Sequence, residues 1–272
     1  MTDYSSELLA HYEGLARSYT QPDFAVSYDE HRPSPPTALL DALCVEAQVE
    51  RPARVIDLGS GTGLSTRVWA ERADEVIGVE ASEEMRAQAE RATDAENVRY
   101  VHALAQQTGL EDASADLVTA SQSFHWMDAT TTLAEIARIL RPGGVFAAYD
   151  YDWPPVCNWE VEAAFTEMVR RVGMLRPLEG QPRHTKDMHL ERMRDSGQFR
   201  FVREIVLHSR ERGNAARIIG MALSLGPLVV LLDRGMTEDE LGLAQLRETA
   251  TRALGTESSQ WFISYRVRLG VK

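Results

Sequence analysis

The feature that most limits the possible folds is a short apolar run followed at once by three closely spaced glycines. Residues 55–63 read Val-Ile-Asp-Leu-Gly-Ser-Gly-Thr-Gly. The β-branched apolar run is typical of a strand buried on both faces, and Leu64–Ala73 is predicted to be the helix that follows. Glycine is needed where a turn takes positive φ or where a ligand approaches the backbone. A helix N-terminus then offers unpaired N–H groups to an anionic group of that ligand. The sequence therefore predicts the first half of a ligand-binding βαβ unit.

A second strand and a carboxylate follow. Glu75–Val79 is predicted to be a strand, and Glu80 at its end can accept two hydrogen bonds from a ribose diol. Over about Ala53–Tyr149 the chain resembles the class I S-adenosylmethionine (SAM)-dependent methyltransferases. Glu80 matches the second motif of that family, and the residues that match its first motif are Asp57, Gly59, Gly61 and Gly63. A dinucleotide-binding Rossmann domain is the alternative, but Gly-Ser-Gly-Thr-Gly lacks the fuller dinucleotide fingerprint.

The resemblance implies SAM as cofactor and S-adenosylhomocysteine as product. Met85 matches the position where the family places an apolar side chain against adenine, although a helical Met is also a common core residue. After the third predicted strand, Val98–Ala103, the family often has an acidic residue, whereas this chain has Leu104. Adenine recognition would then depend on backbone groups around Leu104 and Ala105 and on the Gln106 amide.

A Tyr-x-x-x-Arg-Pro segment also lies near the cofactor in related enzymes, and Tyr28, Arg32 and Pro33 match it. The alternative is that Arg32 is a surface charge and that Tyr28 only packs. The complete set of predicted cofactor contacts is Tyr28, Arg32, Asp57, Gly59, Ser60, Gly61, Gly63, Glu80, Ala81, Met85, Leu104, Ala105, Gln106 and Ser121.

A polar and aromatic cluster follows the fourth predicted strand, Asp116–Ser121. Residues 122–128 read Gln-Ser-Phe-His-Trp-Met-Asp, at the sheet edge where ligands bind in such folds. The His-Trp pair resembles the small-molecule branch that includes trans-aconitate methyltransferases, and the Asn/Asp-Pro-Pro-Tyr motif of nucleic-acid amino-methyltransferases is missing. His125 is the candidate general base because its pKa range suits that task; otherwise it only packs or hydrogen-bonds. The candidate substrate contacts are Phe124, Trp126, Asp150, Tyr151 and Trp153.

The rest of the chain completes the predicted fold class, which is α/β with a Rossmann-like, doubly wound, seven-stranded sheet, an antiparallel last strand and helical lid insertions. Residues 145–149, 201–208 and 261–269 are the last three strands. The predicted divisions are an N-terminal arm (1–36) that includes a helix over Tyr4–Arg17, a SAM-binding core (37–150), and a remainder (151–272) with lid insertions near 151–185 and 213–257. Within the second insertion, Ala215–Leu232 is apolar but broken at Gly226-Pro227, which favours two buried helices over a membrane span.

Charge and cysteine usage narrow the function. The formal net charge of −12 disfavours a nucleic-acid partner. Two distant cysteines, Cys44 and Cys157, and a polar N-terminus indicate a cytoplasmic protein with no membrane partner, and no metal-ligand spacing is present. The sequence thus predicts a SAM-dependent methyltransferase acting on a small organic molecule at O, N, C or carboxylate, and leaves the oligomeric state open. The alternatives are a non-catalytic SAM- or nucleotide-binding protein and, less favoured, an NAD-dependent dehydrogenase.

Overall fold

The structure, a computed structural model, describes residues 24–175 and 185–272. The predicted helix over Tyr4–Arg17 and most of the N-terminal arm lie outside these residues. The described part contains a seven-stranded sheet in the order β3-β2-β1-β4-β5-β7-β6. Its strands are β1 (Arg54–Leu58), β2 (Glu75–Glu80), β3 (Val98–His102), β4 (Ala115–Ser121), β5 (Leu140–Tyr151), β6 (Phe201–Gly213) and β7 (Ser259–Val271).

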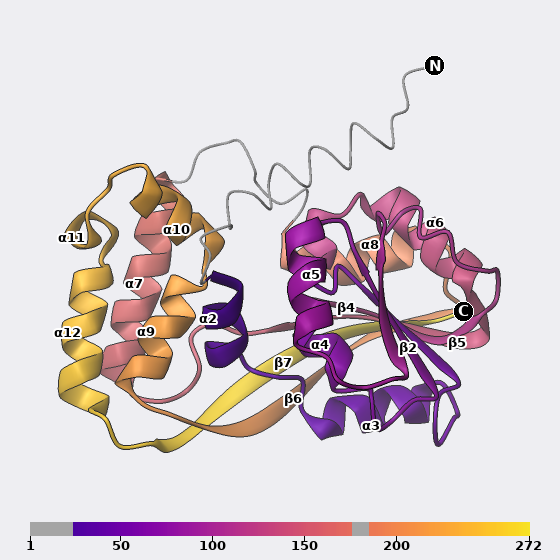
Figure 1. Cartoon of the computed structure of the whole chain (residues 1–272), viewed down its shortest axis with the longest axis horizontal. Coiled ribbons are helices and arrows are strands. Elements are labelled where there is room, and N and C mark those ends of the chain that lie inside the picture. Colours follow the sequence, from indigo (N-terminus) through magenta and orange to yellow (C-terminus); the bar gives the residue numbers. More distant parts are fainter. Residues whose placement is uncertain (1–23, 176–184) are drawn as a thin grey trace.

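The strand directions confirm the predicted fold class. Strands β1 to β5 pair in parallel, whereas β7 runs antiparallel to both of its neighbours, β5 and β6. The chain order reverses between β1 and β4, so the carboxyl ends of these two strands border the crevice in which doubly wound sheets bind ligands. Strands β6 and β7 are longer than their sequence pattern indicated, and Figure 1 shows them extending from the sheet toward a separate group of helices.

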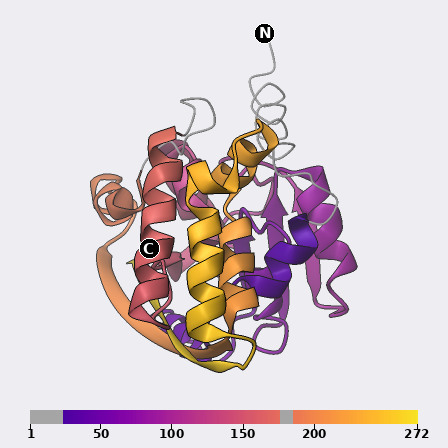
Figure 2. The ribbon, with the colours of Figure 1, turned by 90° about the vertical axis from the view of Figure 1, so that its left-hand side faces the viewer.

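The helices form two groups. Those near the sheet are α2 (Phe24–His31), α3 (Thr37–Glu46), α4 (Leu64–Arg67), α5 (Glu83–Arg91), α6 (Ala129–Ile139) and α8 (His189–Asp195), with short 3-10 turns at Phe124–Trp126 and Lys186–Met188. A helical layer, which faces the viewer in Figure 2, contains α7 (Trp159–Leu175), α9 (Ala215–Leu223), α10 (Gly226–Asp233), α11 (Glu238–Leu241) and α12 (Leu243–Leu254). Helix α2 lies between this layer and the sheet (Figure 1).

Helix α4 is shorter than predicted. The helix expected over Leu64–Ala73 ends at Arg67, and the backbone continues in tighter turns in which the Trp69 N–H donates to Thr66 O and the Ala70 N–H to Arg67 O. These turns place the Trp69 side chain, which has no exposed surface, against α3. Tertiary burial of one large aromatic side chain thus overrides the helical pattern.

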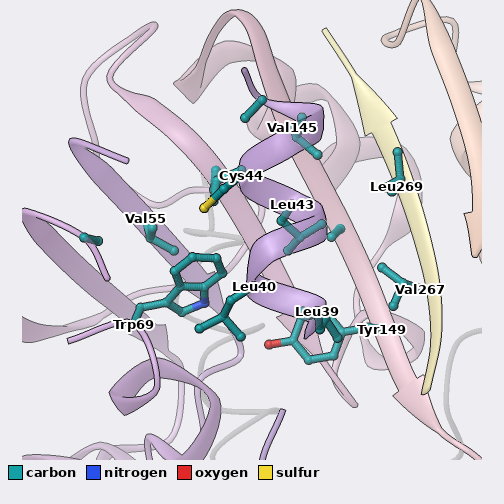
Figure 3. Close-up of a cluster of buried hydrophobic side chains, with 14 of the residues drawn as sticks. Leu39, Leu40, Leu43, Cys44, Val55, Trp69, Val145, Tyr149, Val267 and Leu269 are labelled. Carbon is teal, nitrogen blue, oxygen red and sulfur yellow. The ribbon is translucent and has the colours of Figure 1, made fainter. Parts of the chain in front are cut away.

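Apolar side chains cover both faces of the sheet. On one face, Leu39, Leu40 and Leu43 of α3 pack with Val55 and Trp69 (Figure 3). On the other face Ile56, the next residue of β1, packs with α6, as alternation along a strand requires. The short apolar run is therefore buried on both sides, as predicted, and its carboxyl end is held rigidly at the crevice.

The apolar stretch in the second insertion folds as two helices, α9 and α10, separated by a 74° bend. No single helix among the described residues has the length and apolar character needed to cross a bilayer. The bent pair α9 and α10 reaches that length and apolar character only when the two helices are counted together. The prediction of two short helices is confirmed, and their buried side chains pack with α7 and α12.

Candidate active site

A cavity opens at the carboxyl ends of β1, β2 and β4 and encloses about 1330 Å³, its open mouth included. It unites residues that lie far apart in the sequence. The predicted site residues that line it are Tyr28, Arg32, Gly59, Ser60, Gly61, Glu80, Ala81, Met85, Leu104, Ala105, Gln106, Ser121, Trp126 and Tyr151. The lining also includes residues that the sequence interpretation missed, among them Ser82, Gln122 and Ser123, which adjoin the predicted positions.

The three glycines of the loop after β1, residues 59–63, have different surroundings. Gly59 has a φ of +64°, and a Cβ there would lie 2.7 Å from the Cβ of Ser123, so only glycine allows the two loops to meet. Gly61 has a φ of +57° and a Cβ there would meet nothing within 4 Å, which leaves its bare Cα on the cavity wall. Gly63 does not line the cavity; it packs against Tyr100.

The Glu80 side chain lines the cavity and binds the backbone of the glycine loop. Its Oε2 accepts the Gly61 N–H at 2.7 Å and its Oε1 accepts the Ser82 N–H at 2.8 Å. Burial raises the pKa of this carboxyl above its ordinary value, in opposition to these two hydrogen bonds. Since each carboxylate oxygen has a second lone pair, Glu80 retains the capacity to accept hydrogen bonds from a ribose diol.

Asp57 has no exposed surface and does not line the cavity. Its carboxylate accepts hydrogen bonds from the hydroxyls of Ser65, Thr66 and Thr119 at 2.6–2.8 Å. Burial raises the pKa of Asp57, and these hydroxyls oppose that shift. The first-motif aspartate therefore fixes the loop to α4 and β4 from behind and acts on a ligand only through the loop.

Helix α2 is tied to the same loop by Asp29. Its carboxylate accepts a hydrogen bond from the Thr62 hydroxyl and pairs with Arg67 at 2.7 Å, while Arg67 also donates to Thr62 O at 2.6 Å. This contact places Tyr28 and Arg32, on the same segment as Asp29, at the cavity.

The predicted catalytic and substrate residues divide into two groups. Trp126 and Tyr151 line the cavity, and Trp153 stacks over the Arg32 guanidinium at 4.9 Å. Phe124 does not: it is fully buried, with its ring 5.5 Å from that of Phe146. The structure does not bring Phe124 to the cavity, because its side chain belongs to the core between the sheet and α6, and its contact with substrate stays a prediction.

His125 and Asp150 lie behind the cavity wall in a buried polar cluster. Asp150 pairs with Lys186 at 3.1 Å, with Arg268 at 3.2 Å and with His189 at 3.3 Å. Burial would raise the pKa of Asp150, but the hydrogen bond from His189 and the positive charge of Lys186 hold it below its ordinary value. Asp150 thus compensates buried cations behind the cavity wall, and its predicted contact with substrate stays a prediction.

His125, Asp150 and His189 also bring potential metal ligands within 4.8 Å of one another. The Asp150 carboxylate already compensates the charges of Lys186 and Arg268. A divalent cation beside these two cations would be repelled in a buried environment. The cluster is therefore better suited to anchoring α8 to β5 than to holding a metal.

Sequence reasoning missed Lys186, His189 and Arg268 because no spacing links them to Asp150. Arg268 even contradicts the predicted pattern of β7, since it stands on the polar side of the alternation but is only 4% exposed. Its burial follows from the antiparallel register, which places Arg268 opposite Ala148 on β5 and opposite Glu204 on β6. Ala148 lies two residues before Asp150 and therefore on the same face of β5.

Substitution of Gly61 by Ala is expected to weaken S-adenosylhomocysteine binding at least tenfold, because the new methyl group occupies the cavity wall. The positive φ alone should cost about 1–2 kcal/mol of stability. Gly109→Ala is the matched control: its φ is +71°, it also has nothing within 4 Å of a Cβ, and it lies outside the cavity. Equal loss of thermal stability in both variants, with reduced affinity by calorimetry only in Gly61→Ala, is the expected result. Unchanged affinity in Gly61→Ala would remove the loop from the binding site.

Comparison with known proteins agrees with this geometry. Residues 56–148 match the family model described as a methyltransferase domain. An uncharacterized methyltransferase of Mycobacterium tuberculosis is 37% identical over 118 residues, which is 43% of this chain and 46% of the relative. A malonyl-[acyl-carrier protein] O-methyltransferase of Enterobacter lignolyticus is 37% identical over 108 residues, 39% of this chain and 42% of the relative. The matched segment thus spans just under half the length of these curated relatives.

A solved structure extends the similarity beyond that segment. A putative type II methyltransferase from Anaeromyxobacter dehalogenans superposes with a TM-score of 0.65 and 25% identity, covering 88% of this chain and 97% of that chain. The glycine loop, the Glu80 carboxylate and the strand order agree with these matches, which identify residues 56–148 as a methyltransferase domain.

Proposed function

We propose that this chain is a SAM-dependent methyltransferase whose acceptor is a small organic molecule. The observation that carries the proposal is a single cavity in which the bare Gly61 backbone and the Glu80 carboxylate meet two aromatic side chains, Trp126 after β4 and Tyr151 at the end of β5. A methyltransferase must hold a nucleoside and a second ligand side by side, and this cavity extends from β2 past β4 to Tyr151 at the end of β5.

The residues present fit SAM. Glu80 would hold the ribose diol, the glycine loop would receive the amino-acid end, and Met85, Leu104 and Ala105 would form apolar walls for adenine. Bound SAM supplies an electrophilic methyl group, so the protein has to orient the acceptor and exclude water. Helix α2, fixed to the loop by Asp29, and the helical layer behind it would cover the acceptor side.

A small acceptor is favoured by charge and by enclosure. The net charge of −12 repels phosphate backbones, and Tyr28 and Tyr151 line the cavity with aromatic side chains. The named Enterobacter relative is an O-methyltransferase, which supports oxygen as one acceptor atom within this class.

Labelled SAM incubated with the purified chain and a metabolite extract tests the proposal. Transfer of label to compounds of low molecular mass is the expected result. S-adenosylhomocysteine binding without any transfer would favour a non-catalytic SAM-binding protein. Quenching of intrinsic Trp fluorescence by NADH, but not by S-adenosylhomocysteine, would instead indicate a dehydrogenase.

His125 remains the proposed general base for an acceptor whose O or N is protonated at neutral pH. It lies one residue before the cavity-lining Trp126 but is 7% exposed and does not itself line the cavity, so this role requires the acceptor or a water molecule to reach the ring past the cavity wall. His125→Ala is expected to lower turnover about 100-fold or more while leaving the Kd for S-adenosylhomocysteine within twofold. Full turnover in this variant would exclude the role.

A further inference from the structure

The Arg32 guanidinium is a buried cation at the cavity. Arg32 is 9% exposed, yet it lines the cavity together with Tyr28 and Tyr151. The rings of Tyr28 and Trp153 lie 4.5 Å and 4.9 Å from its central carbon. Aromatic faces attract a cation, but they do not neutralise its charge.

Every hydrogen-bond acceptor that the structure gives Arg32 is neutral. Its Nε donates to Ser224 Oγ at 2.6 Å, one Nη2–H donates to Ser224 O at 2.6 Å, and one Nη1–H donates to Tyr151 Oη at 2.5 Å. Within residues 24–175 and 185–272 no carboxylate forms an ion pair with it. A guanidinium has five N–H bonds, so one on each terminal nitrogen is left for another ligand.

A buried charge without a counter-ion is costly, and a guanidinium with one N–H free on each terminal nitrogen is suited to two oxygens of a carboxylate or phosphate. We propose that Arg32 binds an anionic group of the methyl acceptor, so that the acceptor is an organic acid. This inference rests on the proposed methyltransferase function and specifies its substrate class.

The position of Arg32 favours the acceptor over the amino-acid end of the cofactor. Its hydrogen-bond partners are Tyr151 at the end of β5 and Ser224 at the end of α9, whereas the glycine loop follows β1. With β4 between β1 and β5, the ends of those strands are roughly 10 Å apart. Arg32 therefore stands on the side of the cavity formed by β5 and the helical layer.

The anionic group would anchor the acceptor without being the methylated atom. A guanidinium draws electron density from the oxygens that it binds, so these oxygens are weakened as nucleophiles. The nucleophile is then a different atom of the acceptor, and the methylated product keeps its acid group.

The experiment compares acids with their neutral amides. With S-adenosylhomocysteine at saturation, binding of benzoate, hexanoate and phenyl phosphate is measured by calorimetry against benzamide and hexanamide. The wild-type chain is expected to bind at least one acid tenfold or more tightly than the amides. That preference should be lost in Arg32→Gln and reduced in Arg32→Lys, which keeps the charge without the planar fork. Arg234→Gln, which removes an exposed guanidinium at the C-cap of α10, is the matched control and should behave as wild type.

A second measurement separates the two possible anions. S-adenosylhomocysteine carries an amino-acid carboxylate, whereas 5′-methylthioadenosine lacks it. If Arg32 serves the acceptor, Arg32→Gln binds both nucleosides within twofold of wild type. A tenfold loss confined to S-adenosylhomocysteine would assign Arg32 to the cofactor and overturn the proposal, as would a wild-type chain that shows no preference for acids. Failure of the wild-type chain to bind either nucleoside would instead contradict the proposed function. The acid preference of the wild type needs no variant, so an unstable Arg32→Gln would not prevent the test.

Discussion

Replacement of Asp150 by Asn is expected to lower the free energy of unfolding at pH 7 by about 3–5 kcal/mol, the usual cost of removing one partner from a buried ion pair. Asp150 is 4% exposed and compensates Arg268, which is also 4% exposed, together with Lys186. The neutral amide leaves Arg268 with Glu204 as its remaining partner. Urea unfolding at pH 7 measures the difference.

Asp152→Asn is the matched control, because Asp152 lies directly beyond β5 and pairs with Arg266 at 3.0 Å, but the two side chains are 42% and 44% exposed. An exposed pair contributes about 0–1 kcal/mol to the free energy of unfolding.

The pH dependence of stability gives a second test of the role of Asp150. Because the pKa of Asp150 is lowered in the folded state, its stabilisation is complete above the unfolded pKa of about 3.9 and is lost as the pH falls below that value. The gap between wild type and Asp150→Asn should therefore narrow below pH 4; a gap under 1 kcal/mol at pH 7 would contradict the structural role.

Glu80→Ala is expected to weaken S-adenosylhomocysteine binding at least tenfold. The ribose diol would lose two charge-assisted hydrogen bonds, each contributing about 1.5–3 kcal/mol, and the Gly61 N–H would lose its acceptor. Calorimetry measures the change. Glu84→Ala removes an exposed carboxylate from the first turn of α5 and should leave the affinity unchanged.

The pH dependence of binding tests the same carboxylate. Burial raises the pKa of Glu80, and the protonated carboxyl is a poorer acceptor for the diol. The affinity of the wild type should therefore decrease as the pH falls through this raised pKa, which lies above the ordinary glutamate value. Glu80→Gln cannot titrate and should show a flatter profile over that interval. Parallel profiles for the two proteins would assign the pH dependence to another group.

The contacts close in the chain could be predicted from the sequence. The apolar run of β1, the glycines that follow it and the carboxylate that ends β2 lie within one βαβ unit, so their spacing predicts that the loop and Glu80 lie at the same sheet edge. The structure joins them there by the hydrogen bond from the Gly61 N–H to Glu80. The alternation along β7 likewise predicted a strand with one buried side, and the apolar stretch broken at Gly226-Pro227 predicted α9 and α10.

Other predicted site residues lie outside the cavity lining, because packing between distant segments decides the environment of a side chain. Phe124 follows β4 at the predicted binding edge, but its ring fits the core beside Phe146. Asp150 lies near the carboxyl end of β5, where a ligand-binding residue is expected. However, Arg268 of β7 and Lys186, which precedes α8, form ion pairs with it. A local sequence pattern does not indicate contacts between segments that lie far apart in the chain.

The sequence by itself determined the α/β class, the glycine loop and the carboxylate at the end of β2, because these depend on short-range spacing and on the period of apolar residues. Only the tertiary structure decided that Asp57 acts from behind the loop and that Asp150 compensates buried cations. It also decided that Arg32 reaches the cavity with only neutral hydrogen-bond partners among the residues that the structure describes. The physical reason is that burial and charge compensation depend on which distant elements pack together. Ser224 and Arg32 are separated by 192 positions in the chain, and only the packing of α9 near α2 makes them neighbours.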